Sequence, residues 1–395
     1  MRFTVIGIDD NKEQQFTREV VDVIQSNTVF SGGKRHREIV SPLLPASHQW
    51  IDIVVPLDSA FEAYQGFDKV VVFASGDPLF YGFANTIQKR LPEAEVEVFP
   101  TFNSLQTLAH RMVMPYHDMH IVSLTGRSWD KFDEALIAGY DKIGVLTDNK
   151  EHTPADIARH MLDYGYDNYK MTVGELLGNR DCERITETTI ERASESCFTH
   201  PNNLILQKTY NRPRPFGIPE GEFHLLDGRA KMITKMPVRL LSLSMLDLRN
   251  KAVLWDIGFC TGSVSIEAKL QFPHLKVIAF EKREEGRELL RLNALKFGTP
   301  GITSIIGDYT NADITNLPTP DAAFIGGHGG EIKDVIHKTC SALNKDGVIV
   351  FNSVSEESRK LFTEALNENN LQINRCISIK VDEHNTIEVI QSHKK

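Results

Sequence analysis

The stretch Val253-Leu-Trp-Asp-Ile-Gly-Phe-Cys-Thr-Gly262 decides the fold of the second half of the chain. Val253 to Ile257 has the composition of a buried strand. Gly258 and Gly262 allow a tight turn and a close approach of backbone to ligand, because neither residue has a Cβ. A helix that begins after this turn directs its unpaired N–H groups toward a bound molecule. The pattern therefore predicts the nucleoside-binding turn of an α/β domain.

Glu281 ends the next predicted strand, where its carboxylate can accept hydrogen bonds from ribose hydroxyls. A dinucleotide-binding turn would read Gly-x-Gly-x-x-Gly, but Cys260 occupies the middle glycine position here. The pattern Asp-x-Gly-x-x-Thr-Gly favours S-adenosylmethionine over NAD. The turn by itself would also suit an ordinary tight connection, so the interpretation depends on Asp256 before it and Glu281 after it.

Length and composition limit the possible classes of protein. A chain of 395 residues suits two domains of about 200 residues each. The formal net charge of −9 argues against a general nucleic-acid binder. The five cysteines form no Cys-x-x-Cys pair, which predicts neither a metal site nor a disulfide framework. We therefore expect a cytoplasmic protein, and the lack of a long apolar run predicts no membrane span.

The first 208 residues alternate apolar, β-rich runs with helical patterns, which predicts a mainly parallel sheet covered by helices. The expected strands are 3–8, 70–74, 96–99, 120–124 and 143–147, and the expected helices are 83–90, 104–113 and 154–164. The later runs 170–175, 186–191 and 204–207 lack long intervening helices and are typical of antiparallel strands. This half therefore predicts a domain of two α/β lobes over residues 1–208.

Residues 209–233 lose this periodicity and are rich in proline and glycine, so we expect a linker that is held against one or both domains. Residues 234–395 then alternate strand and helix. The expected strands are 252–257, 276–280, 304–306, 322–325 and 347–351, and the expected helices are 263–271, 283–297, 331–342 and 356–367. A closing hairpin of 372–381 and 386–391, turning through 382–385, fits a Rossmann-like, seven-stranded methyltransferase sheet.

A second glycine turn, Ser75-Gly-Asp-Pro-Leu-Phe-Tyr-Gly82, follows an apolar strand in the first half. Open α/β sheets bind ligands outside the carboxyl ends of their strands, which is where Gly76 to Pro78 would lie. Gly76 allows the backbone to approach a ligand, and Pro78 fixes the shape of the loop. Taken alone, Gly-Asp-Pro also fits an ordinary turn.

With Gly7 on the first strand and Pro100-Thr-Phe-Asn-Ser-Leu-Gln106 after a later one, this turn resembles the tetrapyrrole methylases. Two further stretches carry the resemblance: Ser31-Gly-Gly-Lys-Arg35 and Val122-Ser-Leu-Thr-Gly-Arg127. The resemblance implies a two-lobed fold that holds S-adenosylmethionine between its lobes. The cofactor contacts that it implies are Gly7, Gly76, Asp77, Pro78, Phe102 and Ser104.

The second half resembles the decarboxylating corrin methyltransferases, which have a class I methyltransferase fold. The stretches that carry this resemblance are Met232-Ile-Thr-Lys-Met-Pro-Val-Arg239, Leu254 to Glu267, and Phe324-Ile-Gly-Gly-His-Gly-Gly-Glu331. The implied cofactor contacts are Thr234, Gly258, Phe259, Cys260, Thr261, Gly262, Glu281, Asp308 and Tyr309.

Both halves in this order resemble the bifunctional precorrin methyltransferases of cobalamin (vitamin B12) synthesis. The resemblance implies methylation of a precorrin-6Y/6B, or of its cobalt form, at carbon 5 by the first domain. The second domain would methylate carbon 15 and remove the carboxylate of the acetate arm on carbon 12. It also implies a homo-oligomer that needs neither nucleic acid nor a membrane as a partner.

Such a substrate carries many carboxylate arms, so cations should line its cleft in spite of the acidic net charge. The cationic candidates are Arg35, Arg127, Lys235 and Arg239, although each could instead be a solvated surface charge. Gly326, Gly327 and His328 follow the predicted strand 322–325, where the substrate would meet the methyl group. His328 is the candidate for catalytic proton transfer.

Three positions depart from the patterns of these families. The first strand continues as Gly7-Ile-Asp-Asp-Asn11 where Gly-x-Gly-Pro-Gly is usual. Thr125 and Pro237 replace a histidine and a glutamate respectively. We expect Pro237 to leave a helix intact, because proline is tolerated in a first helical turn, and to remove only the carboxylate's contact.

Two alternatives remain at this stage. One is an RNA-modifying methyltransferase with an accessory domain, although strand 322–325 lacks the following Asn/Asp-Pro-Pro-Tyr/Phe that is common for nucleobase substrates. The other is a module without catalytic activity that binds the methyl donor or an intermediate and contains one inactive domain.

Overall fold

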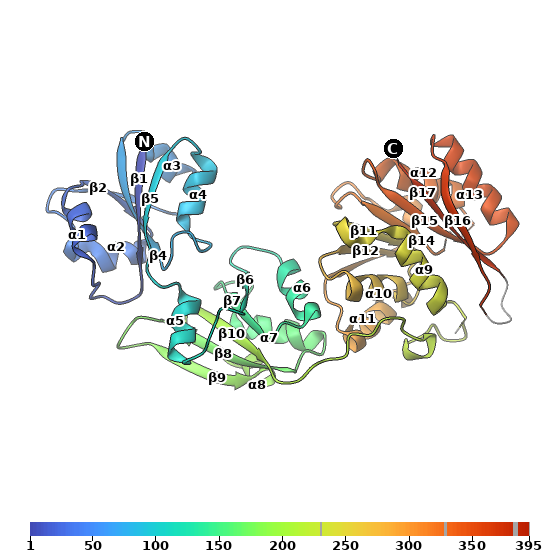
Figure 1. The fold of residues 1–395 in the computed structure, drawn as a ribbon, viewed down its shortest axis with the longest axis horizontal. Coiled ribbons are helices and arrows are strands. Elements are labelled where there is room, and N and C mark those ends of the chain that lie inside the picture. Colours follow the sequence, from blue (N-terminus) through green and yellow to red (C-terminus); the bar gives the residue numbers. More distant parts are fainter. Residues whose placement is uncertain (230, 328–329, 382–385, 395) are drawn as a thin grey trace. The chain divides into compact units, whose positions relative to one another are not determined.

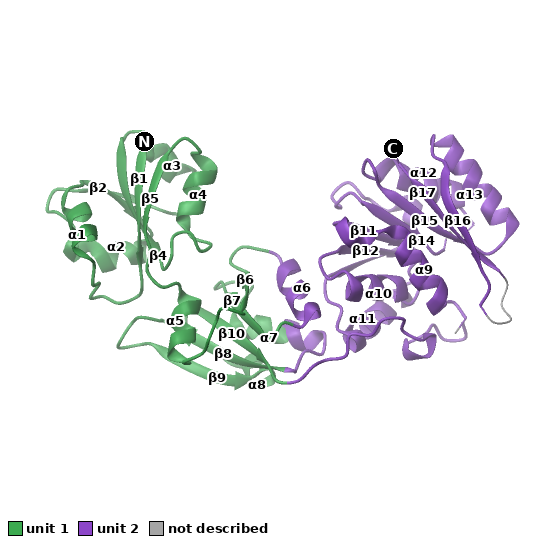
Figure 2. Cartoon of the chain, in the orientation of Figure 1, with its two compact units in different colours: residues 1–127, 140–159, 169–209 green, residues 128–139, 160–168, 210–395 purple. Residues whose placement is uncertain are grey.

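The computed structural model describes residues 1–229, 231–327, 330–381 and 386–394 (Figure 1). The chain divides into two compact units (Figure 2). Unit 1 comprises residues 1–127, 140–159 and 169–209, and unit 2 comprises 128–139, 160–168 and 210–395. None of the helices in the described ranges combines the length and the apolar character needed to cross a bilayer.

The first sheet of unit 1 is parallel, with strand order β3-β2-β4-β1-β5. Its strands are β1 (Arg2–Ile8), β2 (Val29–Gly32), β3 (Gln49–Asp52), β4 (Lys69–Ser75) and β5 (Glu95–Phe99). Apolar side chains of β1 and β4 alternate between two cores, so helices cover both faces. One core includes α3 (Asp58–Tyr64) and α4 (Phe83–Arg90), and the other includes α1 (Arg18–Gln25) and α2 (Lys34–Val40).

The second sheet of unit 1 has the order β6-β7-β10-β8-β9, and only β6 and β7 run parallel. Its strands are β6 (His120–Ser123), β7 (Lys142–Leu146), β8 (Tyr169–Glu175), β9 (Arg184–Thr189) and β10 (Asn202–Lys208). Its helices are α5 (Ser104–Arg111), α7 (Pro154–Asp163), which continues into unit 2, and the short α8 (Ile190–Ser194). The prediction of antiparallel strands over 170–207 is confirmed.

Unit 2 contains a seven-stranded sheet in the order β13-β12-β11-β14-β15-β17-β16, which confirms the predicted class I architecture. Its strands are β11 (Val253–Ile257), β12 (Lys276–Glu281), β13 (Ile302–Ile306), β14 (Ala322–Ile325), β15 (Val348–Ser353), β16 (Ile373–Ile379) and β17 (Ile387–His393). Six strands run in the same direction, and β17, which pairs antiparallel with both β15 and β16, runs in the opposite direction. The predicted turn 382–385 lies outside the described residues.

The side chains of β11 show how this sheet is covered. Trp255 and Ile257 join a core with α12 (Ile332–Ala342) and α13 (Glu356–Glu368). Leu254 points to the other face, into a core with α9 (Met236–Leu246) and α10 (Ser263–Gln271). Helix α11 (Glu285–Phe297) packs beside α10, and α6 (Asp130–Ala138) also belongs to unit 2. The strand is therefore buried on both faces, as expected for the centre of a parallel sheet.

A fully buried ion pair between α9 and α10 holds the segment before α9 against these two helices. Nε of Arg239 lies 2.8 Å from Oε2 of Glu267, and neither side chain is exposed. Arg239 also donates to the carbonyl oxygens of Thr234 (2.7 Å) and Ile218. Glu267 in turn accepts from the backbone N–H groups of Gly217 and Ile218. The expectation that residues 209–233 are held against a domain is thus confirmed for unit 2.

Glu267→Gln should destabilise unit 2 by about 3–5 kcal/mol, because it leaves the Arg239 guanidinium buried without its counter-charge. The measurement is unfolding in urea, monitored by hydrogen exchange of peptides from α10 and β11. Glu288→Gln is the matched control, because Glu288 pairs with Arg291 at the exposed surface. An equal shift of the urea midpoint in both variants would contradict the role of the buried pair.

Candidate functional site

The first two residues of the glycine turn after β11 are held by backbone hydrogen bonds to the end of β12. The N–H groups of Gly258 and Phe259 donate to the carbonyl oxygen of Phe280 at 2.8 and 3.1 Å. Gly258 has φ +77°, and a Cβ there would lie 2.7 Å from backbone atoms of Gly327. Because any side chain at position 258 would collide with this backbone, the turn requires glycine for two independent reasons.

Asp256 joins the strand to the first turn of α10. Its Oδ2 accepts hydrogen bonds from the backbone N–H (3.1 Å) and hydroxyl (2.5 Å) of Ser265. Its Oδ1 is buried and has no hydrogen-bond partner among the described residues. Burial raises the pKa of Asp256 to about 7, against the opposing effect of the Ser265 hydrogen bonds.

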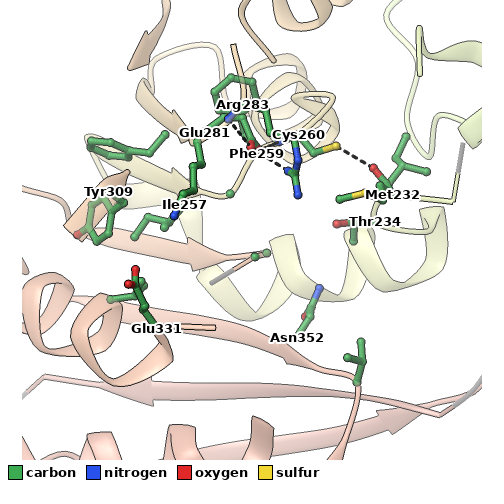
Figure 3. Close-up of a pocket in the computed structure, with 18 of the residues that line it drawn as sticks. Met232, Thr234, Ile257, Phe259, Cys260, Glu281, Arg283, Tyr309, Glu331 and Asn352 are labelled. Carbon is green, nitrogen blue, oxygen red and sulfur yellow. Dashed lines mark hydrogen bonds and ion pairs between the residues drawn. The ribbon is translucent and has the colours of Figure 1, made fainter. Parts of the chain in front are cut away.

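Glu281 joins the same turn to the end of β12. Its Oε2 accepts from the backbone N–H of Cys260 at 2.9 Å. Its Oε1 accepts from the backbone N–H and the guanidinium of Arg283 at 3.0 and 2.9 Å (Figure 3). Oε1 thus already accepts two hydrogen bonds, whereas Oε2 accepts one and retains a lone pair, so Oε2 can still accept a hydrogen bond from a hydroxyl of a bound ribose.

A cavity of about 560 Å³ opens in front of this turn. The loops at the carboxyl ends of the parallel strands and the segment before α9 surround it, which is where open α/β sheets bind ligands. The predicted site residues that line it are Thr234, Lys235, Gly258, Phe259, Cys260, Glu281, Asp308, Tyr309, Gly326 and Gly327. Figure 3 shows Glu281, Cys260 and Tyr309 around one part of it and Thr234 and Asn352 around another.

The remaining predicted residues of unit 2 lie elsewhere. Thr261 is buried behind the turn, where its carbonyl oxygen accepts from Asn293 at 2.9 Å. Gly262, with φ +75°, packs against Leu290 and starts α10. His328 lies outside the described residues. Tyr309, although it lines the cavity, is largely buried, and its hydroxyl lies 3.1 Å from that of Thr339, so only part of its ring can face a ligand.

The substrate role expected of Arg239 is wrong. Its guanidinium is fully buried and bonds to Glu267 and to two backbone carbonyl oxygens, so it cannot reach a molecule in the cavity. The cations that do line the cavity are Lys231, Lys235, Lys282 and Arg283. Lys282 pairs with Asp308 at 2.6 Å, and this contact helps to lower the pKa of Asp308 to about 2.

In unit 1, the two predicted glycines touch each other. A Cβ on Gly7 would lie 1.9 Å from the carbonyl oxygen of Gly76, and Gly76 has φ +62°. Oδ1 of Asp77 accepts from the backbone N–H of Leu79 at 2.9 Å and so shapes the loop that contains Pro78. These contacts place the backbone of the loop beside the end of β1, as a ligand-binding turn requires.

Phe102 and Ser104 lie at the start of α5. Phe102 is 59% exposed and rests edge-on against His110, and Ser104 is the first residue of the helix. Asn103 caps this helix by accepting from the N–H of Gln106 at 2.9 Å. The exposed aromatic ring is therefore presented by a well-anchored helix terminus.

The two cations predicted in unit 1 are partly exposed. Arg35 donates to the hydroxyl of Ser75 at 2.9 Å and pairs with Asp10 at 3.3 Å. Arg127 donates to the hydroxyl of Ser123 at 2.6 Å and lies over the ring of Tyr81, 5.2 Å from its centroid. Asp10, one of the departures from the usual glycine loop, therefore provides a counter-charge for Arg35.

Sequence reasoning missed several residues that line the cavity, including Asn352, Val354 and Ile387. Asn352 follows the apolar run Val348 to Phe351. A polar residue at the carboxyl end of a buried strand is the same signal that identified Glu281, so Asn352 could have been found. Among the described residues, no cluster of three or more His, Cys, Asp or Glu side chains could hold a metal ion.

The seven-stranded sheet and the ribose-type carboxylate beside a glycine turn define a class I methyltransferase domain. Comparison with known proteins agrees in both halves. Residues 2–194 match the model of the tetrapyrrole (corrin/porphyrin) methylases, and residues 226–393 match that of the precorrin methyltransferase domain.

A precorrin-6Y C(5,15)-methyltransferase [decarboxylating] from a Sinorhizobium species is 33% identical over 357 residues, which cover 90% of this chain and 85% of that protein. A cobalt-precorrin-6B C(15)-methyltransferase (decarboxylating) from Salmonella typhimurium is 38% identical over 133 residues, 34% of this chain and 68% of that protein. The crystal structure of a precorrin-6Y C5,15-methyltransferase from Geobacter metallireducens GS-15 has 32% identity and a TM-score of 0.42, covering 47% of this chain and all of that one. The chain belongs to the precorrin-6Y C5,15-methyltransferase (decarboxylating) family.

Glu281→Gln should weaken the binding of S-adenosylhomocysteine to unit 2 by roughly 10- to 100-fold, the effect of losing a hydrogen bond to a charged group. The measurement is calorimetric titration of the whole protein. Glu284→Gln is the control, because Glu284 is exposed and pairs with Arg287. Unchanged binding in Glu281→Gln would show that this carboxylate does not contact the ligand.

Asp256 should give unit 2 a distinctive dependence of stability on pH. Its folded pKa is raised from 3.8 to about 7, so its contribution to stability is fully present below about pH 4 and is lost as the pH rises through 7. The amide that replaces this carboxyl group in Asp256→Asn cannot ionise. The free energy of unfolding of Asp256→Asn, relative to the unsubstituted protein, should therefore increase between pH 5 and pH 8.

Asp321→Asn is the control for this measurement. Hydrogen bonds from Asn344 and from the backbone of Ala252 and Val253 lower the pKa of Asp321, so it is ionised throughout that range in both states. The free energy of unfolding of Asp321→Asn, relative to the unsubstituted protein, should be the same at pH 5 and pH 8. If that of Asp256→Asn were also independent of pH over this range, the raised pKa of Asp256 would be contradicted.

Proposed function

We propose that this protein uses S-adenosylmethionine to methylate a precorrin at carbons 5 and 15 and to decarboxylate the acetate arm on carbon 12, in cobalamin synthesis. The observation that carries the proposal is the cavity of unit 2. One part of this cavity is lined by a turn of the kind that binds nucleosides. Another part, lined by residues at the ends of β15 and β17, leaves room for a second molecule. The activities for which the relatives are named support the choice of substrate.

The residues of the cavity fit the methyl donor. Gly258 leaves room that a Cβ would fill, and the Glu281 carboxylate faces the cavity beside it. When bound, S-adenosylmethionine supplies an electrophilic methyl group on a sulfonium. We assign Thr234, Gly258 to Cys260, Glu281, Asp308 and Tyr309 to its binding, with Thr261 and Gly262 supporting the turn from behind.

What the protein must add is placement and exclusion of water, because a reduced tetrapyrrole already has nucleophilic meso carbons. Holding two reactants in line can contribute up to roughly 7–11 kcal/mol. Lys235 lies at the cavity and can pair with a carboxylate arm of the substrate. Gly326 and Gly327, which lack side chains, let the flat macrocycle approach the backbone closely.

We assign the carbon 5 methylation to residues 1–208, with a second donor site at Gly7, Gly76, Asp77, Pro78, Phe102 and Ser104. Arg35 and Arg127 would contact substrate carboxylates there. Residues 209–233 form the linker, and residues 234–395 form the decarboxylating domain. A cytoplasmic location, a homo-oligomeric state and a proton-transfer role for His328 complete the proposal.

Two donor sites per chain should appear when the whole protein is titrated with S-adenosylhomocysteine. With precorrin-6Y and labelled donor, mass spectrometry of the product should show two added methyl groups and the loss of one carbon dioxide. The product of the Gly76→Val variant should carry one methyl group fewer and should still be decarboxylated. The reason is that a side chain at position 76 would collide with the backbone of Asn103 in the carbon 5 domain. Glu281→Gln should instead slow the methylation of carbon 15.

Other outcomes would favour the alternatives. Saturation at a single donor site would indicate one inactive domain. Affinity for tRNA that weakens steeply with salt, without affinity for polycarboxylate tetrapyrroles, would favour an RNA-modifying enzyme.

A further inference from the structure

Asn352 presents an amide to the cavity from the carboxyl end of β15. Its Oδ1 accepts a hydrogen bond from the hydroxyl of Ser242 on α9 at 3.0 Å. No partner for its NH2 group is found among the described residues, and Figure 3 shows the amide nitrogen directed into the cavity, toward the side lined by Thr234. Ser242 is fully buried, so this orientation is set from behind the cavity wall.

The place of Asn352 in the sheet separates it from the donor residues. The donor turn and Glu281 belong to β11 and β12, whereas Asn352 belongs to β15, on the other side of β14. Gly326 and Gly327 follow β14 and therefore lie between the two parts of the cavity. A methyl acceptor that lies across these glycines would meet the donor with one edge and Asn352 with another.

The surroundings of Asn352 are mainly apolar. Val238, Val354 and Ile387 line the cavity with it, and β17 continues the sheet beside β15. The carboxylates that line the cavity are those of Glu281, Asp308 and Glu331, which lie on β12 and after β13 and β14. None of the described lining residues of β15 or β17, or of the segment just after β15, carries a charge.

We propose that the NH2 group of Asn352 binds the carboxylate of the acetate arm that is lost. This inference rests on the proposed function. In the reaction, the bond between the methylene carbon and the carboxylate carbon breaks, and carbon dioxide leaves. The electron pair passes into the conjugated macrocycle, and a proton derived from water then adds to the methylene carbon to leave a methyl group.

A neutral donor suits this step better than a cation. A lysine or arginine would pair strongly with the carboxylate and stabilise the ground state, whereas the product carbon dioxide is uncharged. An amide fixes the direction of the carboxylate without neutralising it. The apolar neighbours remove water from a charge that is about to disappear, which favours its loss.

Ser242 acts as a positioning residue for this contact. If the amide turned over, Oδ1 would face the carboxylate and repel it. The single proton of the Ser242 hydroxyl is shared between Oδ1 of Asn352, at 3.0 Å, and the carbonyl oxygen of Val238, at 2.8 Å and one turn earlier in α9. The orientation of Asn352 therefore depends on the packing of α9 against β15.

The test is single-turnover decarboxylation of precorrin by the whole protein, with methyl count and carbon dioxide release measured separately. Asn352→Ala should slow carbon dioxide release by roughly 10- to 100-fold, because the acetate arm is no longer held in the direction in which its breaking bond overlaps the conjugated macrocycle. Asn352→Asp, of nearly the same shape, should slow it further, because its carboxylate repels the substrate. Affinity for S-adenosylhomocysteine should stay unchanged in both.

Ser242→Ala should lower the rate of decarboxylation at saturating substrate and leave the KM of the donor unchanged. Asn367→Ala, an exposed substitution on α13, is the matched control and should behave as the unsubstituted protein. Normal carbon dioxide release by Asn352→Ala, or an equal loss of donor affinity, would overturn the inference. Inactivity of the unsubstituted protein toward precorrin would instead overturn the proposed function itself.

Discussion

The hydrogen bond from the backbone N–H of Cys260 to Glu281 is the contact on which the turn of the proposed donor site depends. It joins the turn after β11 to the end of β12 at 2.9 Å. Cys260 takes φ +51°, a conformation that costs a non-glycine residue free energy, and this contact helps to hold it there. Its thiol donates in addition to the carbonyl oxygen of Met232 at 3.0 Å, which ties the turn to the segment before α9. A cysteine can therefore stand where a dinucleotide-binding turn needs glycine.

The segment before α9 shows how a change in one residue is compensated elsewhere. Pro237 occupies the first turn of α9, as expected, and the helix is intact. The carboxylate that proline removes from this position has a counterpart in Glu220, which accepts a hydrogen bond from the N–H of Met236. An acidic group thus still meets the N-terminus of α9, supplied by the linker. This contact packs Glu220 of the linker against unit 2.

Periodicity and strand-end residues were sufficient to predict most of unit 2, because its strands are long apolar runs. They were insufficient for β2 and β3 in unit 1. Ser31 interrupts the apolar pattern of β2, and its buried hydroxyl contacts Tyr64 and the carbonyl oxygen of Ile51, which no local pattern reveals. Arg239 shows the same limit for a site. A cation near a glycine turn suggests a substrate contact, but its counter-charge, Glu267, comes from a helix that sequence spacing does not place beside it.

The acidic net charge and the polyanionic substrate are compatible because the protein needs cations only where carboxylates must be held. The cations of the cavity belong to the segment before α9 and the loop after β12, whereas the described lining residues of β15 and β17 are uncharged. A carboxylate that is retained gains from an ion pair, but one that must leave as carbon dioxide is slowed by it. The distribution of charge across one sheet edge can therefore select which arm of the macrocycle reacts.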